Sequence, residues 1–239
     1  MVSALGLGRG EVALEVGPGK GILTRALLAR GVRVIAFEKD TVLAGFLAET
    51  LSGDITNGML TLINDDIFNL PLYTKHAAGK PFSGPYTVAA NIPYNITGSF
   101  LRFLFSLSPQ PLRAVLMLER HVAERIAQDQ KESILSISVK VYGTPRYLKS
   151  VSRGNFIPKP RVDSAVISID GISRNFFRSI DEKKFFSLVR KGFAHKRKKL
   201  SKNLGVEEAL LLSCGLPTNA RAENLSADMW ACVYKKIYE

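Results

Sequence analysis

The stretch Val12-Ala13-Leu14-Glu15-Val16-Gly17-Pro18-Gly19-Lys20-Gly21-Ile22 decides the fold. An apolar run typical of a buried strand leads into a turn with three glycines, and a helical pattern follows. Glycine has no side chain and reaches positive φ, so this turn lets a ligand approach the backbone closely. The stretch therefore predicts the first unit of a doubly wound α/β sheet, with a ligand crevice at the carboxyl end of the strand.

Strand-like and helical patterns alternate through the first two-thirds of the chain. The expected strands are 12–16, 32–38, 60–63, 86–90, 114–118, 135–142 and 165–169, and the expected helices are 22–29, 42–51, 99–106 and 120–128. This alternation predicts a parallel sheet covered by helices on both faces. The last two strands lack a crossover helix between them, so we expect them to form an antiparallel hairpin at one edge.

Only helical patterns follow residue 181. They cover 182–193, 196–203, 206–213 and 226–237, with glycines and a proline between them and Ser226 as an expected cap of the last helix. The predicted fold class is α/β: a Rossmann-like sheet in residues 1–172 and a small C-terminal all-α domain in residues 173–239.

The chain is basic, with 33 Lys and Arg against 21 Asp and Glu and a formal net charge of +12. Residues 1–170 hold 19 basic and 14 acidic side chains, whereas the remaining 69 hold 14 and 7, so the excess is denser in the C-terminal part. Such a charge indicates a polyanionic partner, either nucleic acid or an anionic membrane surface.

Other features bear on the compartment. No apolar run approaches the ~18 residues of a membrane span, and the start of the chain lacks the pattern of a signal peptide. Cys214 and Cys232 are too few for a disulfide framework and lie in apolar helical surroundings, so we expect buried free thiols and a cytoplasmic location. The histidines are scattered, and no Cys/His spacing predicts a metal site.

Acidic residues at the ends of the first three strands predict an S-adenosylmethionine site. Glu15 precedes the glycines Gly17, Gly19 and Gly21 and is placed to pair with an ammonium group, which a phosphate-binding loop would not favour. Glu38 ends the second strand, where a carboxylate accepts hydrogen bonds from ribose hydroxyls. Asp66 is the expected acceptor for the adenine amino group, with Asp65 or a turn role left open. The expected cofactor-binding residues are Glu15, Gly17, Gly19, Gly21, Glu38, Lys39, Asp66, Ile67 and Asn91. A dinucleotide site or a plain tight turn remains an alternative for the glycine loop, as does a solvated acid for Glu38.

The segment Ala90-Asn91-Ile92-Pro93-Tyr94-Asn95 follows the fourth expected strand and predicts the catalytic loop. The adenine amino group is a poor nucleophile because its lone pair is delocalised into the ring. The Asn91 side-chain oxygen and the Pro93 carbonyl can hold its two N–H groups, while Tyr94 stacks on the base. A proline turn with a packed tyrosine is the alternative.

A second stacking residue is expected in Asn155-Phe156-Ile157-Pro158-Lys159-Pro160-Arg161-Val162-Asp163-Ser164. Two prolines stiffen this loop, so Phe156 is expected to face the base while Lys159 and Arg161 reach phosphates. The alternative is a core phenylalanine at the entry to an edge strand.

A run of basic residues near the C-terminus is expected to contact RNA phosphates. At helical spacing Lys191, His195, Lys198 and Lys202 would share one face. The remaining members of the expected RNA-binding set are Lys196, Arg197 and Lys199. Ordinary surface lysines are the alternative.

Taken together, these motifs resemble those of the ribosomal RNA adenine dimethyltransferase family over nearly the whole chain. The glycine loop with Glu15 is similar to its first cofactor motif, Glu38 to its ribose acid and Asp66 to its adenine-binding acid. Asn91-Ile92-Pro93-Tyr94 resembles its Asn-Leu/Ile-Pro-Tyr catalytic motif, and 156–164 its second stacking motif. The resemblance implies a Rossmann-like S-adenosylmethionine methyltransferase.

The C-terminal part resembles the small-subunit branch of that family. Residues 193–204 are similar to its Phe-x-x-Arg-Arg-Lys helix, and 221–226 to its Arg-x-Glu-x-Leu-Ser/Thr segment. The resemblance implies two adjacent adenines near the 3′ end of small-subunit rRNA as the substrate, each dimethylated. It also implies the small ribosomal subunit as partner. From the absence of an apolar run and of a Cys/His spacing we expect neither a membrane nor a metal partner, and we expect a monomer.

Three other functions stay open. A large-subunit methyltransferase of the macrolide-resistance type shares the catalytic motifs, a non-catalytic ribosome-assembly factor shares the fold, and a DNA adenine methyltransferase would usually add a target-recognition domain. The family's first motif follows a Gly-Gln-Asn/His-Phe-Leu segment that packs over the cofactor. The residues before Val12 carry no such segment, so the resemblance implies nothing for that part of the site.

Overall fold

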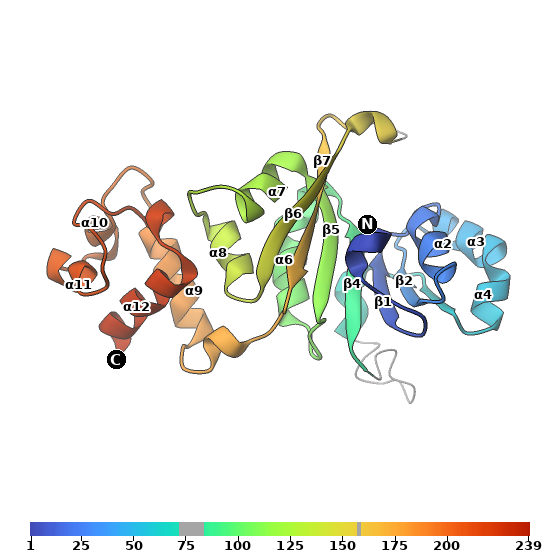
Figure 1. Cartoon of the computed structure of the whole chain (residues 1–239), viewed down its shortest axis with the longest axis horizontal. Coiled ribbons are helices and arrows are strands. Elements are labelled where there is room, and N and C mark those ends of the chain that lie inside the picture. The colour runs from blue at the N-terminus through green and yellow to red at the C-terminus, as the bar shows by residue number, and fades with distance from the viewer. Residues whose placement is uncertain (72–83, 157–158) are drawn as a thin grey trace. The chain divides into compact units, whose positions relative to one another are not determined.

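A computed structural model describes residues 1–71, 84–156 and 159–239 (Figure 1). The chain packs as two compact units, one of residues 1–123 and 146–172 and the other of residues 124–145 and 173–239. The second unit includes all residues after Ile172, as in the expected helical domain. It also includes residues 124–145, which were expected in the sheet domain.

The first unit is built on a seven-stranded sheet with the order β3-β2-β1-β4-β5-β7-β6. Its strands are β1 (Val12–Val16), β2 (Arg33–Phe37), β3 (Leu60–Ile63), β4 (Tyr86–Asn91), β5 (Arg113–Glu119), β6 (Thr144–Val151) and β7 (Ser164–Asp170). The five strands from β3 to β5 pair in parallel, and β7 runs antiparallel to β5. The predicted α/β fold with a Rossmann-like sheet is confirmed.

Burial explains why these residues form strands. In β1, β2, β4 and β7 nearly every position is buried, as expected for strands covered on both faces. The first unit also contains α1 (Val2–Leu5), α2 (Ile22–Leu28), α3 (Thr41–Thr50), α4 (Ser52–Thr56) and α6 (Thr97–Ser106), and α7 (Arg120–Ala127) begins in it. Helix α2 packs on β2, α3 and α4 pack on β3, and α1 packs on β5 (Figure 1).

The second unit is helical. It contains α8 (Ile134–Lys140), α9 (Glu182–Gly192), α10 (Leu200–Leu204), α11 (Glu208–Leu212) and α12 (Ala227–Tyr238). Helices α10 and α12 both pack on α9, around the fully buried Trp230, against which Phe193 stacks. The Ser226 side chain accepts a hydrogen bond from Met229 N, so the predicted cap of the last helix is confirmed. The helical C-terminal part is likewise confirmed.

The expected strand over 135–142 is wrong, because this segment forms α8. Its alternating Leu-Ser-Ile-Ser-Val pattern has the period of a strand, but a capping box overrides it. Ser133 Oγ accepts from Ser136 N at 3.1 Å, and Ser133 N donates to Ser136 Oγ at 2.7 Å. The strand beside β7 is instead β6, which the sequence reading missed, so the expected hairpin partner was also wrong.

The expected helix over 196–203 is also too long, since α10 begins only at Leu200. Residues 195–198 form bends and a turn, and four adjacent cations disfavour a helix because their charges repel. The Asn203 amide also donates to the carbonyls of Gly192, at 2.7 Å, and His195, at 3.0 Å, which holds the chain in a turn. The predicted shared helical face of the basic residues is therefore wrong.

The expectation of buried free thiols is wrong as well. Cys214, after α11, and Cys232, in α12, form a disulfide, and both are half-buried. Because α11 and α12 pack together, they bring two residues that lie 18 positions apart to a Cα–Cα distance of 5.9 Å, within the range that a disulfide spans. Within residues 1–71, 84–156 and 159–239, no helix has the length and apolarity to cross a membrane.

Candidate active site

The register of the sheet gathers the predicted site at one edge. Val16 pairs with Phe37 on one side and with Ala90 on the other, so the glycine loop, Glu38 and Asn91 all begin at the same level. Ile63 pairs with Phe37, which brings the loop after β3 to the same edge. The strand order reverses between β1 and β4, and such a reversal is where open α/β sheets form their ligand crevice.

The glycine loop has a conformation that only glycine adopts easily. Gly17, Gly19 and Gly21 have φ values of 66°, 59° and 78°, in the left-handed region. A Cβ on Gly19 would meet no described atom within 4 Å, so this residue presents bare backbone to open space. The loop therefore leaves room for a ligand against its peptide groups.

Glu38 is held against this loop by the backbone. Its Oε2 accepts a hydrogen bond from Gly19 N at 2.9 Å, and its Oε1 accepts one from Asp40 N at 2.9 Å. The residue is only 6% exposed. Each carboxylate oxygen keeps a second lone pair, so the fixed carboxylate can still accept from a hydroxyl group.

Glu15 is the most unusual acid at this edge, because it is 1% exposed and burial raises its pKa from 4.5 to about 7. Thr24 lowers that pKa by hydrogen bonding, and the charge of Glu38 raises it. Among the described residues, no hydrogen-bond partner reaches Glu15 Oε2. A buried acceptor without a donor fits a ligand that brings its own N–H groups or ordered water.

The two acids after β3 have different partners. Asp65 Oδ1 accepts from Asp66 N at 2.7 Å and from Asn69 Nδ2 at 2.8 Å, an arrangement typical of a turn. Asp66 Oδ2 instead pairs with Lys39 Nζ at 2.8 Å, which lowers the pKa of Asp66 and raises that of Lys39. The neighbouring Ile67 is buried. Asp66 thus keeps a charged carboxylate at the crevice, with the exposed Lys39 beside it.

The predicted catalytic loop forms one wall of a hollow of about 230 Å³. Asn91 ends β4 and is exposed, while the buried Ile92 anchors the loop by donating its N–H to Met117 O at 3.0 Å. The Pro93 carbonyl accepts from Ile96 N at 3.1 Å, which leaves it one further lone pair. The hollow is lined by Asn91, Ile92, Pro93, Tyr94, Phe156 and Pro160.

This hollow joins the two predicted stacking residues, which lie 62 positions apart in the sequence. Phe156 follows the turn Arg153–Asn155, whose Arg153 N donates to Asp163 Oδ1 at 3.0 Å. Lys159 and Arg161 are exposed at the same loop. Ile157 and Pro158 of the expected motif lie outside the described residues.

In the second unit, the basic residues between α9 and α10 line a separate hollow of about 490 Å³. Its lining residues are His195, Lys196, Arg197 and Lys198. Lys191 Nζ donates to Leu204 O at 2.6 Å and Lys199 Nζ pairs with Glu208 at 3.2 Å, so these two side chains have protein partners. In the described part of the chain, the side chains of Lys196, Arg197 and Lys198 form no ion pair.

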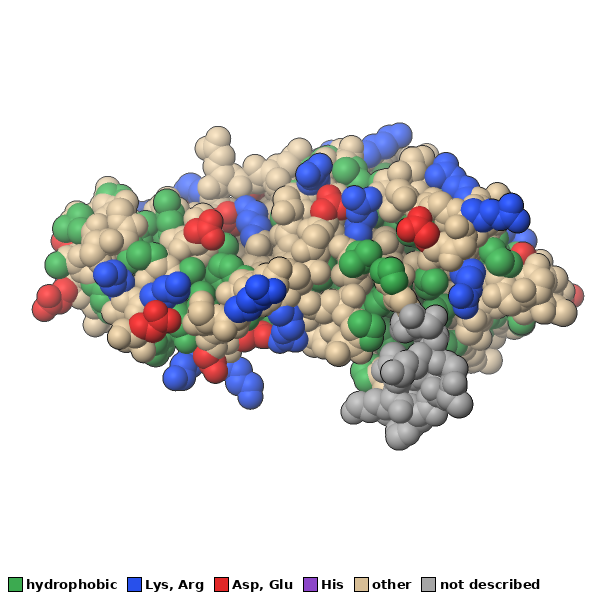
Figure 2. Space-filling model, turned by 60° about the horizontal axis from the view of Figure 1, so that its bottom comes forward, with side chains coloured by type: hydrophobic (Ala, Val, Ile, Leu, Met, Phe, Trp, Pro, Cys, Tyr) green, Lys and Arg blue, Asp and Glu red, His purple; other side chains and the backbone are tan. Residues whose placement is uncertain are grey.

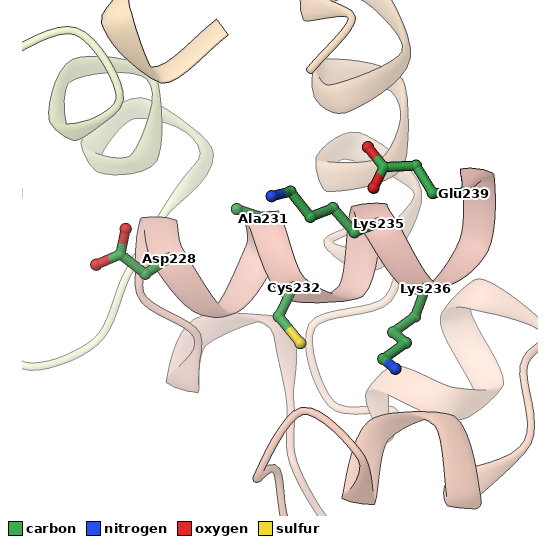
Figure 3. A pocket seen from close by; sticks show the side chains of 6 residues that line it. All are labelled: Asp228, Ala231, Cys232, Lys235, Lys236 and Glu239. Carbon is green, nitrogen blue, oxygen red and sulfur yellow. The ribbon is translucent and has the colours of Figure 1, made fainter. Parts of the chain in front are cut away.

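A larger depression, of about 610 Å³, lies on α12 (Figure 3). All six of its lining residues belong to this one helix or its end, and Cys232 and Lys236 point to one side while Lys235 and Glu239 point to the other. A site that carries out chemistry needs groups that converge from several elements. We therefore assign no binding or catalytic role to this depression. No group of three or more His, Cys, Asp or Glu in the described ranges could hold a metal ion.

Comparison with known sequences identifies the family of this chain. The family model described as ribosomal RNA adenine dimethylase matches residues 1–239. The chain belongs to this family. A relative in Dehalococcoides mccartyi, named ribosomal RNA small subunit methyltransferase A, is 34% identical over 229 residues, covering 92% of this chain and 76% of the relative. A protein of the same name in Streptococcus sanguinis is 36% identical over 234 residues, covering 92% and 80%.

Solved structures agree on the fold of this dimethylase family member. A dimethyladenosine transferase from Plasmodium falciparum aligns with a TM-score of 0.78 and 23% identity, over 97% of this chain and 91% of that one. The 23S rRNA methyltransferase ErmE aligns with a TM-score of 0.76 and 22% identity, over 99% and 95%. These structures support the fold, while the family model and the curated relatives confirm the family resemblance predicted from the motifs.

Three polar groups that the motifs did not predict contact the residues of the candidate site. Thr24 lies beside Glu15, the Asn64 amide donates to Glu38 O at 2.8 Å, and Ser164 bonds the Tyr94 hydroxyl. Ser164 and Asn64 both lie in segments whose motifs predict site residues, Ser164 at the end of 155–164 and Asn64 directly before Asp65 and Asp66. Thr24 carries no sequence signal, because its role depends on packing between elements.

Proposed function

We propose that the chain transfers methyl groups from S-adenosylmethionine to the N6 amino groups of two adjacent adenines near the 3′ end of small-subunit rRNA. Membership of the ribosomal RNA adenine dimethylase family carries this proposal, and the relatives named ribosomal RNA small subunit methyltransferase A favour the small subunit. We further propose that the protein acts as a monomer on the ribosomal subunit, without a metal ion. Its proposed cytoplasmic location rests on the rRNA substrate and not on free thiols, because Cys214 and Cys232 form a disulfide.

The residues at the crevice fit S-adenosylmethionine. The glycine loop offers bare backbone, Glu38 presents a fixed carboxylate for ribose hydroxyls, and the orphaned Glu15 Oε2 suits an ammonium group, directly or through water. Asp66 would accept from the adenine amino group, with Lys39 and Ile67 beside it. When bound, S-adenosylmethionine supplies an electrophilic methyl group.

The chain's own residues orient the substrate amino group. Asn91 Oδ1 and the Pro93 carbonyl would accept its two N–H groups, so that its lone pair faces the incoming methyl group. Since the Pro93 carbonyl already accepts from Ile96 N, Asn91 is the stronger remaining acceptor. Tyr94 and Phe156 would stack on the flipped base, which stabilises it by about 1–3 kcal/mol per base. The amino nitrogen would gain the methyl group that the sulfonium loses and would give up one of its protons.

RNA binding would rest on basic groups that hold phosphates and carry no sequence information. We assign this role to Lys159, Arg161, Lys191, His195, Lys196, Arg197, Lys198, Lys199 and Lys202. Lys191 and Lys199 already have protein partners, so we expect the hollow of His195, Lys196, Arg197 and Lys198 to contribute most in the helical unit.

The test is methyl transfer from labelled S-adenosylmethionine to unmethylated 30S subunits, with 50S subunits in parallel and nucleoside analysis of the product. Dimethyladenosine in the 30S sample alone supports the proposal. Label in the 50S sample alone would point to a large-subunit enzyme, and binding without transfer would point to an assembly factor.

Asn91→Ala provides the sharpest variant for this assay. We expect kcat to fall by about 10²-fold or more, because one acceptor for the reacting amino group is lost, while RNA affinity stays within about twofold. Asn95→Ala, an exposed asparagine in the same loop, is the matched control and should transfer normally. Equal losses of affinity and turnover in Asn91→Ala would contradict the assigned role.

A further inference from the structure

The Tyr94 hydroxyl is bonded to a buried serine from a distant part of the chain. Tyr94 Oη and Ser164 Oγ are 2.8 Å apart, although the residues are 70 positions apart in the sequence. Ser164 is 1% exposed, whereas Tyr94 is half-buried and lines the hollow with Asn91 and Phe156. The hydroxyl end of the Tyr94 side chain is therefore tethered, while the residue still lines the hollow.

Ser164 is a rigid point of attachment. It is the first residue of β7 and pairs with Glu119 at the end of β5, in the interior of the sheet. The preceding Asp163 is fixed as well, since its carbonyl accepts from Arg120 N at 2.9 Å and its carboxylate pairs with the Arg120 guanidinium at 3.4 Å. A hydroxyl on such a frame moves less than one on a loop.

The same frame also holds the second stacking residue. Asp163 Oδ1 accepts from Arg153 N at 3.0 Å, and Arg153 begins the short turn that leads to Phe156. The start of β7 thus contacts Tyr94 through Ser164 and the Phe156 loop through Asp163. The adjacent residues Asp163 and Ser164 therefore hold both aromatic residues of the hollow.

We propose that Ser164 is a positioning residue that holds the Tyr94 ring at the angle needed to stack on the target adenine. This inference rests on the proposed adenine methylation and adds a residue to it. A stacked ring must lie parallel to the base, and a tyrosine tethered at its hydroxyl cannot swing away from that plane. Because Ser164 is buried, we assign it an action through Tyr94 and not by contact with the base.

The role matters most for the second methyl transfer. Monomethylated adenine has a single N–H left, so Asn91 and the Pro93 carbonyl can no longer both hold it. Its orientation then depends more on the stacked rings. Loss of the tether should therefore slow the second transfer more than the first.

The experiment compares Ser164→Ala, Tyr94→Phe and the double variant in the 30S assay. We expect each single variant to lower kcat by roughly tenfold, with the KM for S-adenosylmethionine unchanged and monomethyladenosine accumulating. Because both changes remove the same hydrogen bond, the double variant should lose no more than about the larger single loss. Additive losses would contradict a shared interaction.

Ser168→Ala is the matched control for losing a buried hydroxyl. Ser168 lies on the same strand, is 4% exposed and bonds Asp170 at 3.2 Å, within its own strand. It should lower the melting temperature as much as Ser164→Ala does, yet leave kcat and the ratio of mono- to dimethyladenosine unchanged. If Ser164→Ala also changes only the melting temperature, the tether is structural and the inference fails.

The unaltered chain separates this inference from the proposed function. No transfer to 30S subunits by the unaltered chain would overturn the function and the inference with it. Normal transfer, with an unchanged product ratio in Ser164→Ala, would overturn the inference alone.

Discussion

At the scale of single residues, Glu15 makes the protein sensitive to pH near neutrality. Burial raises its pKa to about 7, so the folded chain holds a proton that the unfolded chain releases from about pH 4.5 upward. The free energy of unfolding of the ligand-free protein should therefore fall between pH 4.5 and 7, by at most about 3 kcal/mol. Urea titrations across this range should show the fall, and Glu15→Gln should remove it.

Ligand binding should favour the ionised form of Glu15, whereas burial in the ligand-free protein favours its protonated form. An ammonium group near Glu15 favours the carboxylate, so binding of S-adenosylhomocysteine below pH 7 should release a proton. We expect its affinity to rise from pH 6 to 8, and calorimetry in buffers of different ionisation enthalpy should detect the proton. A Glu15→Gln variant that kept the full pH dependence would exclude Glu15 as its source.

At the scale of helices, replacing glycine by alanine should change stability in opposite directions at two positions. A Cβ on Gly192, at the end of α9, would lie 2.3 Å from Trp230 Cη2, whereas one on Gly45, inside α3, would meet nothing within 4 Å. Gly192→Ala should thus destabilise the helical unit by about 1–3 kcal/mol through overpacking. Gly45→Ala should stabilise the sheet unit by about 0.5–1 kcal/mol, because alanine favours the helix. Thermal unfolding of both variants measures these changes in stability. If both variants were less stable than the unaltered chain, the replacement of glycine itself, and not the contact with Trp230, would explain the destabilisation.

The elements that the sequence predicted well are those whose signal is local and strong. The glycine loop after β1 and the loop after β4 lie where their motifs placed them, because a buried apolar strand followed by glycine or proline admits few conformations. The helix over 134–140 was missed because its strand-like alternation is outweighed by the Ser133 capping box. The Cys214–Cys232 pair was missed for another reason: it depends on how α11 and α12 pack, which no local pattern encodes.

At the scale of the whole molecule, the net charge of +12 has two distinct components. Lysine and arginine side chains are spread over the face drawn in Figure 2, and these act together as a weak attraction to any polyanion. The turn between α9 and α10 concentrates charge instead, with His195, Lys196, Arg197 and Lys198 around one hollow. The diffuse charge should speed RNA association, whereas the concentrated charge should hold phosphates at fixed places.

The salt dependence of RNA binding separates these two components. Replacing Lys196, Arg197, Lys198 and Lys199 by glutamine should lower the slope of log affinity against log salt by about 2. Three of these groups form no ion pair with the described residues, and each phosphate contact contributes about 0.7. The matched control removes as much charge from exposed lysines elsewhere in the same unit: Lys183, Lys184, Lys235 and Lys236. If both sets lowered the slope equally, net charge alone would drive binding. A fall confined to the first set would mean that the turn between α9 and α10 contacts phosphates directly.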